Sequence, residues 1–263
     1  MKKWLLLLVG LLCCASLAWA GFGYQVQMAG SVPAVGASYA CDASTADICE
    51  DWDDADTFRL TWTDVTTGGT ISAAAHAGTL SCTDKGSQAI TLTYSSQADL
   101  YARTDLGSAQ AVLYGSVYFI ITDRPNAING TYRTIIAGGG QTDGSSAGIR
   151  ISIKESTSDQ LQVGAFYNST TQLGTFTNIN EDTWYRVSFL RSSDGNATNA
   201  NDTVTWWLNG SEQATVTNAD LVLVQHPRYI TLFNRDEVAE SIGTSVQIDN
   251  LELDYSEMPS ACP

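Results

Sequence analysis

The sequence has few basic residues, and this shortage excludes one large class of partners. It contains 13 Lys and Arg against 28 Asp and Glu, which gives a formal net charge of −15 at pH 7. Because no cluster of Lys and Arg is available to neutralise a phosphate backbone, we exclude nucleic acid as a partner. Charged residues make up only 16% of the chain, but hydrophobic residues at 44% are sufficient to bury a core, which excludes a disordered chain.

Long apolar runs are missing from the chain except at its start. Lys2 and Lys3 precede an apolar stretch at residues 5–12, and Ala18-Trp19-Ala20 has the small-x-small pattern of a cleavage site. The stretch is too short to span a bilayer, which takes about 20 residues. Residues 1–20 are therefore predicted to be a signal peptide of bacterial style, and the protein is expected to be secreted, periplasmic or extracellular.

Metal-binding spacings of cysteine and histidine are also absent. Neither CxxC nor HxxxH occurs, which argues against a zinc site. After the signal peptide the chain keeps four cysteines, Cys41, Cys49, Cys82 and Cys262. An even number in an exported chain predicts two disulfides, with three possible pairings. Pairing Cys41 with Cys49 would close a short loop and leave Cys82 to pair with Cys262.

Amphipathic helices are missing too, and short alternating segments take their place. These segments are rich in β-branched and aromatic residues and are separated by Gly, Asn, Asp and Ser, with Asn209-Gly210 as a strong hairpin signal. The even spacing predicts an all-β fold, a jelly-roll β-sandwich of two antiparallel sheets, in one domain at residues 21–263. Strands are expected at residues 89–94, 112–122, 132–137, 148–154, 160–167, 184–191, 203–208, 229–233 and 245–254.

Alternation along three of these segments assigns their side chains to two faces. Successive side chains of a strand point to opposite sides, so a set of apolar residues spaced by two marks the core face. Trp206 is expected in the core and Trp207 on the opposite side. The expected core set is Ile149, Ile151, Ile153, Tyr185, Val187, Phe189, Val204, Trp206 and Leu208.

Four segments in order resemble concanavalin A-like (laminin-G-like) jelly-roll domains. They are "CEDWDDADTFRLTWT" as the opening strand, "HAGTLSCTDKGSQAITLTYSS" as the next, "DTWYRVSFLRSSDGNATNANDTVTWWLNGSEQA" as the central hairpin, and "VQIDNLELD" as the closing strand. The resemblance spans about residues 49–255. It implies a two-sheet jelly roll in a superfamily that includes lectins, carbohydrate-binding modules, glycosidases, polysaccharide lyases and adhesive modules.

Catalytic motifs of this superfamily are not found in a central strand. The glucanases carry Glu-x-Asp-x-x-Glu, which places two carboxylates about 5 Å apart on one strand. The string occurs once here, at Glu252, Asp254 and Glu257, where it runs past the end of the predicted closing strand. "YARTDLG", with Arg103 and Asp105, resembles the Arg-rich strand of alginate lyases only faintly, and "VQHP" lacks the residue between Gln225 and His226 that their Gln-x-His motif requires. We therefore predict no catalytic residue, and His226 is expected in a solvated loop.

An acidic run near the start of the predicted domain has two interpretations. It is either a solvated acidic turn or part of a calcium site, since calcium takes six to eight oxygen ligands. The family resemblance implies a structural Ca²⁺ between the opening strand and the aspartate of the closing strand. The candidate ligands carried over in this way are Glu50, Asp51 and Asp249.

Glycan binding is the function that the fold, the export signal and the aromatic content favour. Sugars stack on flat aromatic rings and are held by a few polar side chains. We expect the aromatic contacts at Trp207, Trp184, Tyr118 and Tyr132, with Arg186 and Arg150 as polar partners. The alternative for each is an ordinary core or solvated position. Without the signal peptide the charge is −17, which favours neutral glycans through long-range repulsion of anionic ones.

The sequence thus predicts a secreted, lectin-like module that binds a polysaccharide and holds a structural calcium. Two alternatives stay open. One is a structural or adhesive subunit of an extracellular assembly, which would form homo-oligomers or attach to a cell surface. The other is a divergent glycoside hydrolase or polysaccharide lyase.

Overall fold

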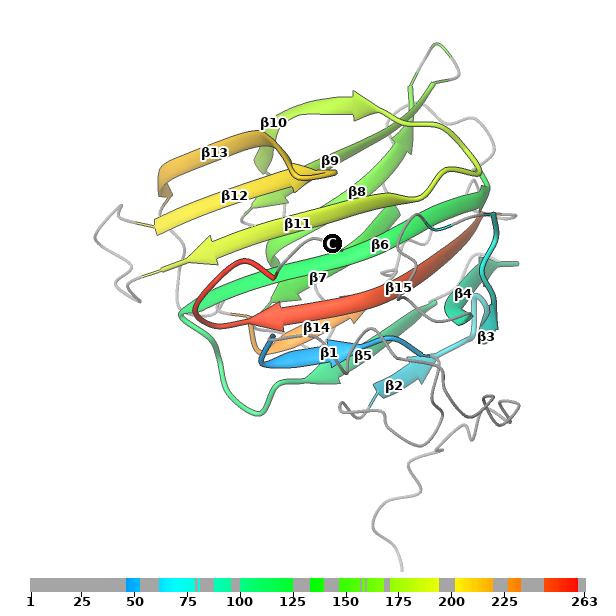
Figure 1. The fold of residues 1–263 in the computed structure, drawn as a ribbon, viewed down its shortest axis with the longest axis horizontal. Coiled ribbons are helices and arrows are strands. Elements are labelled where there is room, and N and C mark those ends of the chain that lie inside the picture. The colour runs from blue at the N-terminus through cyan, green and yellow to red at the C-terminus, as the bar shows by residue number, and fades with distance from the viewer. Residues whose placement is uncertain are drawn as a thin grey trace, which may run out of the picture.

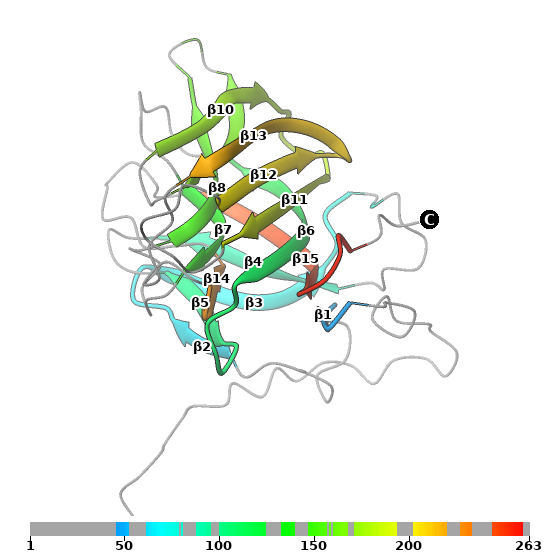
Figure 2. The ribbon, with the colours of Figure 1, turned by 90° about the vertical axis from the view of Figure 1, so that its left-hand side faces the viewer.

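Two antiparallel β-sheets pack face to face in the computed structural model, and the residues that it describes include no helix (Figures 1 and 2). This confirms the predicted all-β sandwich. None of these residues belongs to a helix able to cross a membrane. The structure describes residues 46–52, 62–78, 80, 88–95, 100–124, 133–139, 147–156, 158, 160–167, 171–193, 202–219, 227–232 and 244–259.

The first sheet, sheet A, has eight strands and includes the closing strand predicted from the sequence. β1 (Ile48–Glu50) pairs with the end of β15, which confirms that the opening and closing segments are neighbours. The other strands lie in the order β13 (Ser211–Ala219), β12 (Asp202–Leu208), β11 (Tyr185–Ser192), β6 (Val112–Asp123), β15 (Ser245–Asp254), β4 (Gln88–Tyr94) and β3 (Gly69–Ala75).

The second sheet, sheet B, has seven strands and lies behind sheet A in Figure 1. β14 enters between β7 and β5, although seven strands of the sequence, β6 and β8 to β13, separate it from β5 or β7. The order is β10 (Thr171–Asn178), β9 (Leu161–Tyr167), β8 (Ala147–Glu155), β7 (Arg133–Gly139), β14 (Tyr229–Leu232), β5 (Tyr101–Asp105) and β2 (Trp62–Val65).

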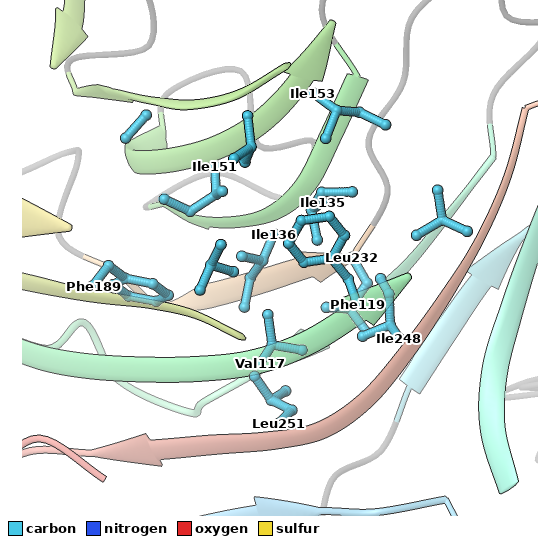
Figure 3. Close-up of a cluster of buried hydrophobic side chains, with 14 of the residues drawn as sticks. Val117, Phe119, Ile135, Ile136, Ile151, Ile153, Phe189, Leu232, Ile248 and Leu251 are labelled. Atoms are coloured by element: carbon cyan, nitrogen blue, oxygen red, sulfur yellow. The ribbon is translucent and has the colours of Figure 1, made fainter. Parts of the chain in front are cut away.

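The core fills the space between the two sheets. Figure 3 shows Ile135, Ile151 and Leu232 of sheet B pointing toward Val117 and Phe189 of sheet A. Burying such side chains removes apolar surface from water and is the main stabilisation of the sandwich. The predicted alternation is confirmed, because all nine expected core residues belong to the core cluster or pack against it.

Nine of the strands were predicted by residue range and six were not. The six without a predicted range, β1, β2, β3, β5, β10 and β13, are short, or rich in Ala, Gly and Thr, so their alternation is weak. His76 follows β3 directly. The hairpin at Asn209-Gly210 is confirmed, and both residues have the positive φ angles, 49° and 79°, that this tight turn requires.

Candidate functional site

A row of residues in register crosses the whole outer face of sheet B. Each member is the direct cross-strand partner of the next, and each lies on the side opposite the core. We call this set the transverse row. From β2 to β10 it consists of Thr63, Arg103, Thr231, Ala137, Arg150, Phe166 and Gln172.

Two tyrosines flank Arg103 at one end of the transverse row. The Arg103 guanidinium carbon lies 5.7 Å from the ring centre of Tyr101 and 6.0 Å from that of Tyr229. Beside them, Arg228 donates two hydrogen bonds of 2.9 Å to the carboxylate of Asp105. These bonds hold the pKa of Asp105 below its ordinary value. This end therefore presents two guanidinium groups beside aromatic rings, one of them paired with an acid.

Two phenylalanines and two cations occupy the other end of the face. Arg150 stacks over the ring of Phe166 at 4.6 Å, and Lys154 lies 4.1 Å from the ring centre of Phe176. The two rings meet edge to face at 5.8 Å. A cation over an aromatic face is attracted by the ring quadrupole, so the rings help to orient both cations.

A bulge in β10 puts Phe176 in this position. The register between β9 and β10 shifts between Leu173 and Thr177, and Phe176 falls in the shifted stretch. Its ring covers Gly164, where an added Cβ would meet three ring atoms at 2.9 Å. Only a glycine allows the ring to lie this close to the sheet, so the half-exposed Phe176 forms a platform on the outer face.

Two hydroxyl groups on the same face are buried without a hydrogen-bond partner. They belong to Thr231, in the transverse row beside Arg103, and to Ser152, two residues from Arg150 on the same side of β8. Their side chains are 1% and 0% exposed. An unsatisfied buried hydroxyl costs about 1–3 kcal/mol, so these two positions are polar defects beneath the outer face.

The outer face of sheet A is arranged differently, because its polar groups bond to other parts of the chain. Arg186 donates from Nε to the Ser116 hydroxyl at 2.7 Å and from a terminal nitrogen to the Pro259 carbonyl at 2.6 Å. Burial lowers the pKa of Arg186. Gln247 donates to the Ala75 carbonyl at 3.0 Å and accepts from the Ala77 amide at 2.6 Å.

Most of the predicted glycan contacts lie on this outer face of sheet A. Trp184 is half-buried, donates to the Ala77 carbonyl at 2.8 Å, and packs with Tyr118 and Leu80. Tyr118 and Arg186 are both 7% exposed, so little of either side chain is open to solvent. The residues after β3 and the segment at Pro259 form hydrogen bonds with this face. Alternation along a single strand cannot reveal such contacts between distant segments.

The remaining predicted contacts are divided between the two faces. Trp207 is half-buried on the outer face of sheet A, on the side opposite Trp206 as predicted. Arg150 is on the outer face of sheet B, in the transverse row. Tyr132 lies outside the described residues. The six candidates therefore do not form one site, and their role in binding stays a prediction.

The predicted calcium ligands are close in the fold but do not form a full coordination shell. Glu50 in β1 pairs with Leu251 of β15, near Asp249, and the side chains of both acids are buried, as is Asp51. Asp249 accepts a 2.7 Å hydrogen bond from the Asn250 amide and lies 3.0 Å from Nε2 of His76. Within the described part of the chain, no group of three or more His, Cys, Asp and Glu side chains is placed to hold a metal.

Two other predictions depend on residues that the structure does not describe. Cys49 is disulfide-bonded. Cys41, Cys82 and Cys262 lie outside the described residues, so the pairing stays a prediction. His226 lies outside them as well.

Sequence reasoning missed most of the outer face of sheet B. Phe166 and Lys154 could have been found, because both lie opposite core residues in segments that were expected to be strands. Arg103 was noticed only for its resemblance to a lyase motif. Tyr101 and Phe176 gave no signal, since β5 and β10 were not anticipated and the bulge that places Phe176 cannot be detected from alternation. Tyr229 begins a strand that was predicted, but its closeness to Arg103 depends on the pairing of β14 with β5.

Comparison with solved structures shows that similar sandwiches occur in carbohydrate-active proteins. An endo-β-1,4-glucuronan lyase from the fungus Trichoderma reesei has a TM-score of 0.55 at 12% identity, over 81% of this chain and 96% of that one. The cellulose-induced protein Cip1 has a TM-score of 0.54 at 14% identity, over 82% and 100%. The alginate lyase Aly36B has a TM-score of 0.50 at 13% identity, over 80% and 97%.

At these identities the likeness extends to the fold alone. No protein-family model matches the chain. No curated protein matches it either.

Proposed function

We propose that the protein is an exported, lectin-like module of the concanavalin A-like type that binds a polysaccharide on the outer face of sheet B. The observation that carries this proposal is the transverse row with its flanking aromatic rings. The row offers polar side chains from β5 to β10, and Phe176 offers a half-exposed ring beside it. Sugar rings stack on such aromatic faces while their hydroxyl groups bond to polar neighbours.

The comparisons support a carbohydrate ligand in general terms. Two of the similar structures are named as lyases of polysaccharides, glucuronan and alginate, and the third is named as induced by cellulose. Sheet B is the better candidate surface in this chain, because the outer face of sheet A uses Arg186, Gln247 and Trp184 for contacts within the protein.

Affinity electrophoresis of the full chain through gels that contain a panel of polysaccharides tests the proposal. We expect retardation in at least one gel. Phe176→Ala should reduce this retardation, because it removes the stacking platform but leaves the buried core intact. Trp207→Ala tests the contact that the sequence predicts on the outer face of the other sheet, where Trp207 is half-buried, and unchanged retardation would remove it from the site. Free migration in every gel would contradict the proposal and would favour the alternative of an assembly subunit.

The same gels separate binding from catalysis. Staining for depolymerised polysaccharide after the run should show no cleared zone if the protein only binds. A cleared zone that follows the protein would replace the binding module with a divergent hydrolase or lyase, the alternative that the sequence left open.

A structural calcium ion forms a second part of the proposal. Glu50 and Asp249 would hold it, since burial of both carboxylates on adjacent strands favours a nearby cation. The fit is incomplete at the level of side chains, because the described residues supply no third ligand of this kind. Backbone carbonyl groups, which are ordinary calcium ligands, would have to complete the shell.

A further inference from the structure

The turn between β12 and β13 carries an asparagine that faces solvent and precedes a glycine. Asn209 and Gly210 are both exposed, and their φ angles of 49° and 79° are those of a tight two-residue hairpin turn. From the geometry of this turn we infer that Asn209 is a site of spontaneous deamidation, in which its side-chain amide becomes a carboxylate. The inference goes beyond the proposed function and does not depend on it.

The attacking group is the backbone nitrogen of Gly210. The ladder between β12 and β13 ends at the pair of Leu208 with Ser211, so the Gly210 amide lies outside the ladder. Glycine places no side chain beside this nitrogen, and even an added Cβ would meet no other atom within 4 Å. The nitrogen is therefore open to water and to the hydroxide ion that removes its proton.

The side-chain carbonyl group of Asn209 is the group attacked, and the neighbouring strand holds it in place. The Arg186 amide of β11 donates a hydrogen bond of 2.9 Å to Oδ1 of Asn209. A backbone donor in this position stabilises the negative charge that forms on Oδ1 during the attack, as in an oxyanion hole. Because the two reacting groups belong to adjacent residues, the reaction also has the advantage of proximity.

The reaction balances with water as its only co-reactant. The Gly210 nitrogen loses its proton and bonds to Cγ of Asn209, while the bond from Cγ to Nδ2 breaks and Nδ2 takes up a proton to leave as ammonia. Water then opens the resulting succinimide ring. Opening at Cγ gives aspartate, whereas opening at the main-chain carbonyl carbon gives isoaspartate, in which the chain passes through the former side chain.

Two other asparagines of the described chain share part of this environment and serve as internal references. Asn250 has the same φ angle of 49°, but it is 0% exposed and is followed by Leu251. Asn178 is exposed, but its Oδ1 accepts a 2.8 Å hydrogen bond from the Gln162 side chain, and the β-branched Ile179 follows it. At both sites the side chain of the next residue crowds the nitrogen that would attack. Both should therefore react much more slowly.

Deamidation would change the charge and the geometry of the hairpin. Aspartate adds a negative charge two residues from Trp207, one of the predicted glycan contacts. Isoaspartate adds a carbon atom to the backbone of the turn and so displaces the two hydrogen bonds, of 2.8 and 2.9 Å, that join Asn209 to Arg186. Protein that has accumulated isoaspartate should consequently have a lower Tm than fresh protein.

Incubation of the full chain in mildly alkaline buffer at body temperature tests the inference. Samples taken over several weeks would be separated by isoelectric focusing, and the acidic form would be mapped by mass spectrometry of its peptides. We expect an acidic form whose mass change lies in the peptide that contains Asn209, with Asn178 and Asn250 unmodified. Its rate should rise with pH, because a peptide nitrogen shares its lone pair with a carbonyl group and attacks only after it loses its proton.

Three variants locate the reaction. Asn209→Gln keeps the amide but would require a larger ring, so the acidic form from this site should be lost. Asn209→Asp should migrate with the aged protein from the start. Asn129→Gln is the matched control, because Asn129-Gly130 is the second Asn-Gly pair of the sequence and lies outside the described residues. It should leave the modification at Asn209 unchanged. An intact Asn209 after incubation, or a mass change confined to other asparagines, would overturn the inference.

Discussion

The two outer faces of this sandwich are built from the same kind of alternating strand, yet they use their polar residues differently. On sheet A, Arg186 and Gln247 bond to Pro259, Ala75 and Ala77, so they join separate segments of one protein. On sheet B, the arginines of the transverse row lie over aromatic rings of their own sheet, Arg103 near Tyr101 and Tyr229 and Arg150 over Phe166.

The difference shows that the position of an arginine on the outer face of a strand does not by itself determine the role of its side chain. Arg186 and Arg150 both lie opposite core residues, but Arg186 is 7% exposed and bonded to the Pro259 carbonyl group, whereas Arg150 is half-buried over the ring of Phe166. Sheet A is not perfectly satisfied, since the Ser188 hydroxyl also lacks a hydrogen-bond partner. The contrast between the faces lies in what the long side chains contact, and it can be tested by substitution.

Arginine substitutions should separate the faces most strongly. Arg186→Ala removes two short hydrogen bonds from a buried cation and leaves the Pro259 carbonyl unpaired. We expect it to lower the free energy of unfolding by about 2–4 kcal/mol, whereas Arg103→Ala should lower it by less than about 1 kcal/mol. Urea denaturation measures both. Equal losses would show that the two faces are structurally equivalent.

Glycines beneath aromatic rings provide a second comparison, with a smaller expected effect. A Cβ added to Gly115 would lie 2.2 Å from the ring of Phe189 in the core, and one added to Gly164 would lie 2.9 Å from the ring of Phe176. Phe189 is buried and cannot move away, so Gly115→Ala should cost about 2–3 kcal/mol.

Gly164→Ala should cost less than about 1 kcal/mol, because the half-exposed Phe176 can swing outward. It should still weaken polysaccharide retention, since the platform is displaced. Thermal melts and affinity gels together check the pair. Normal retention by a folded Gly164→Ala protein would exclude Phe176 from the site.

Calcium removal should act on sheet A alone. If Glu50 and Asp249 hold a structural ion, EDTA should lower Tm by a few degrees, and added calcium should restore it. In a domain of this size a Tm shift of about 2–4 °C corresponds to about 1 kcal/mol of unfolding free energy. Affinity for polysaccharide well below Tm should not change. The calcium proposal fails if EDTA leaves Tm unchanged, and loss of binding without a change in Tm would place the ion on sheet B instead.

The smallest expected effect is the pH response of the exposed pair on sheet B. Hydrogen bonds from Arg228 lower the pKa of Asp105 in the folded state, so the pair stabilises the fold above the ordinary aspartate value of 3.8. This contribution is lost as the pH falls through the lowered pKa. Asp105→Asn should therefore unfold slightly earlier in urea than the parent protein at pH 7, and the difference should vanish at about pH 2. A constant difference at both pH values would exclude the ion pair as its cause.

Sequence alternation predicted the core residues well, because the direction of a side chain depends on its position within its own strand. The positions of Ile151, Phe189 and Trp206 follow from side-chain period alone. Alternation also placed Trp207 and Arg150 away from the core, but it could not show that β12 and β8 belong to different sheets. The predicted glycan contacts were consequently drawn from two faces of the sandwich.

The parts of the site that escaped prediction depend on pairings between distant segments. Thr231 becomes the neighbour of Arg103 and Ala137 only because β14 enters sheet B between β5 and β7. Phe176 reaches Gly164 through a bulge, which breaks the period that sequence analysis relies on. A single sequence holds no local signal for either arrangement.

The entry of β14 between β5 and β7 also fixes when the transverse row can exist during folding. Its members are contributed by seven strands, and one of the inner members, Thr231, is synthesised after all the others. Because loops must close over long sequence separations before such pairings form, the row should assemble late and slowly compared with hairpins such as β12–β13. A nascent chain would therefore have no complete row until β14 was made. The rate at which ligand affinity recovers during refolding would then report the rate of the last step in the assembly of sheet B.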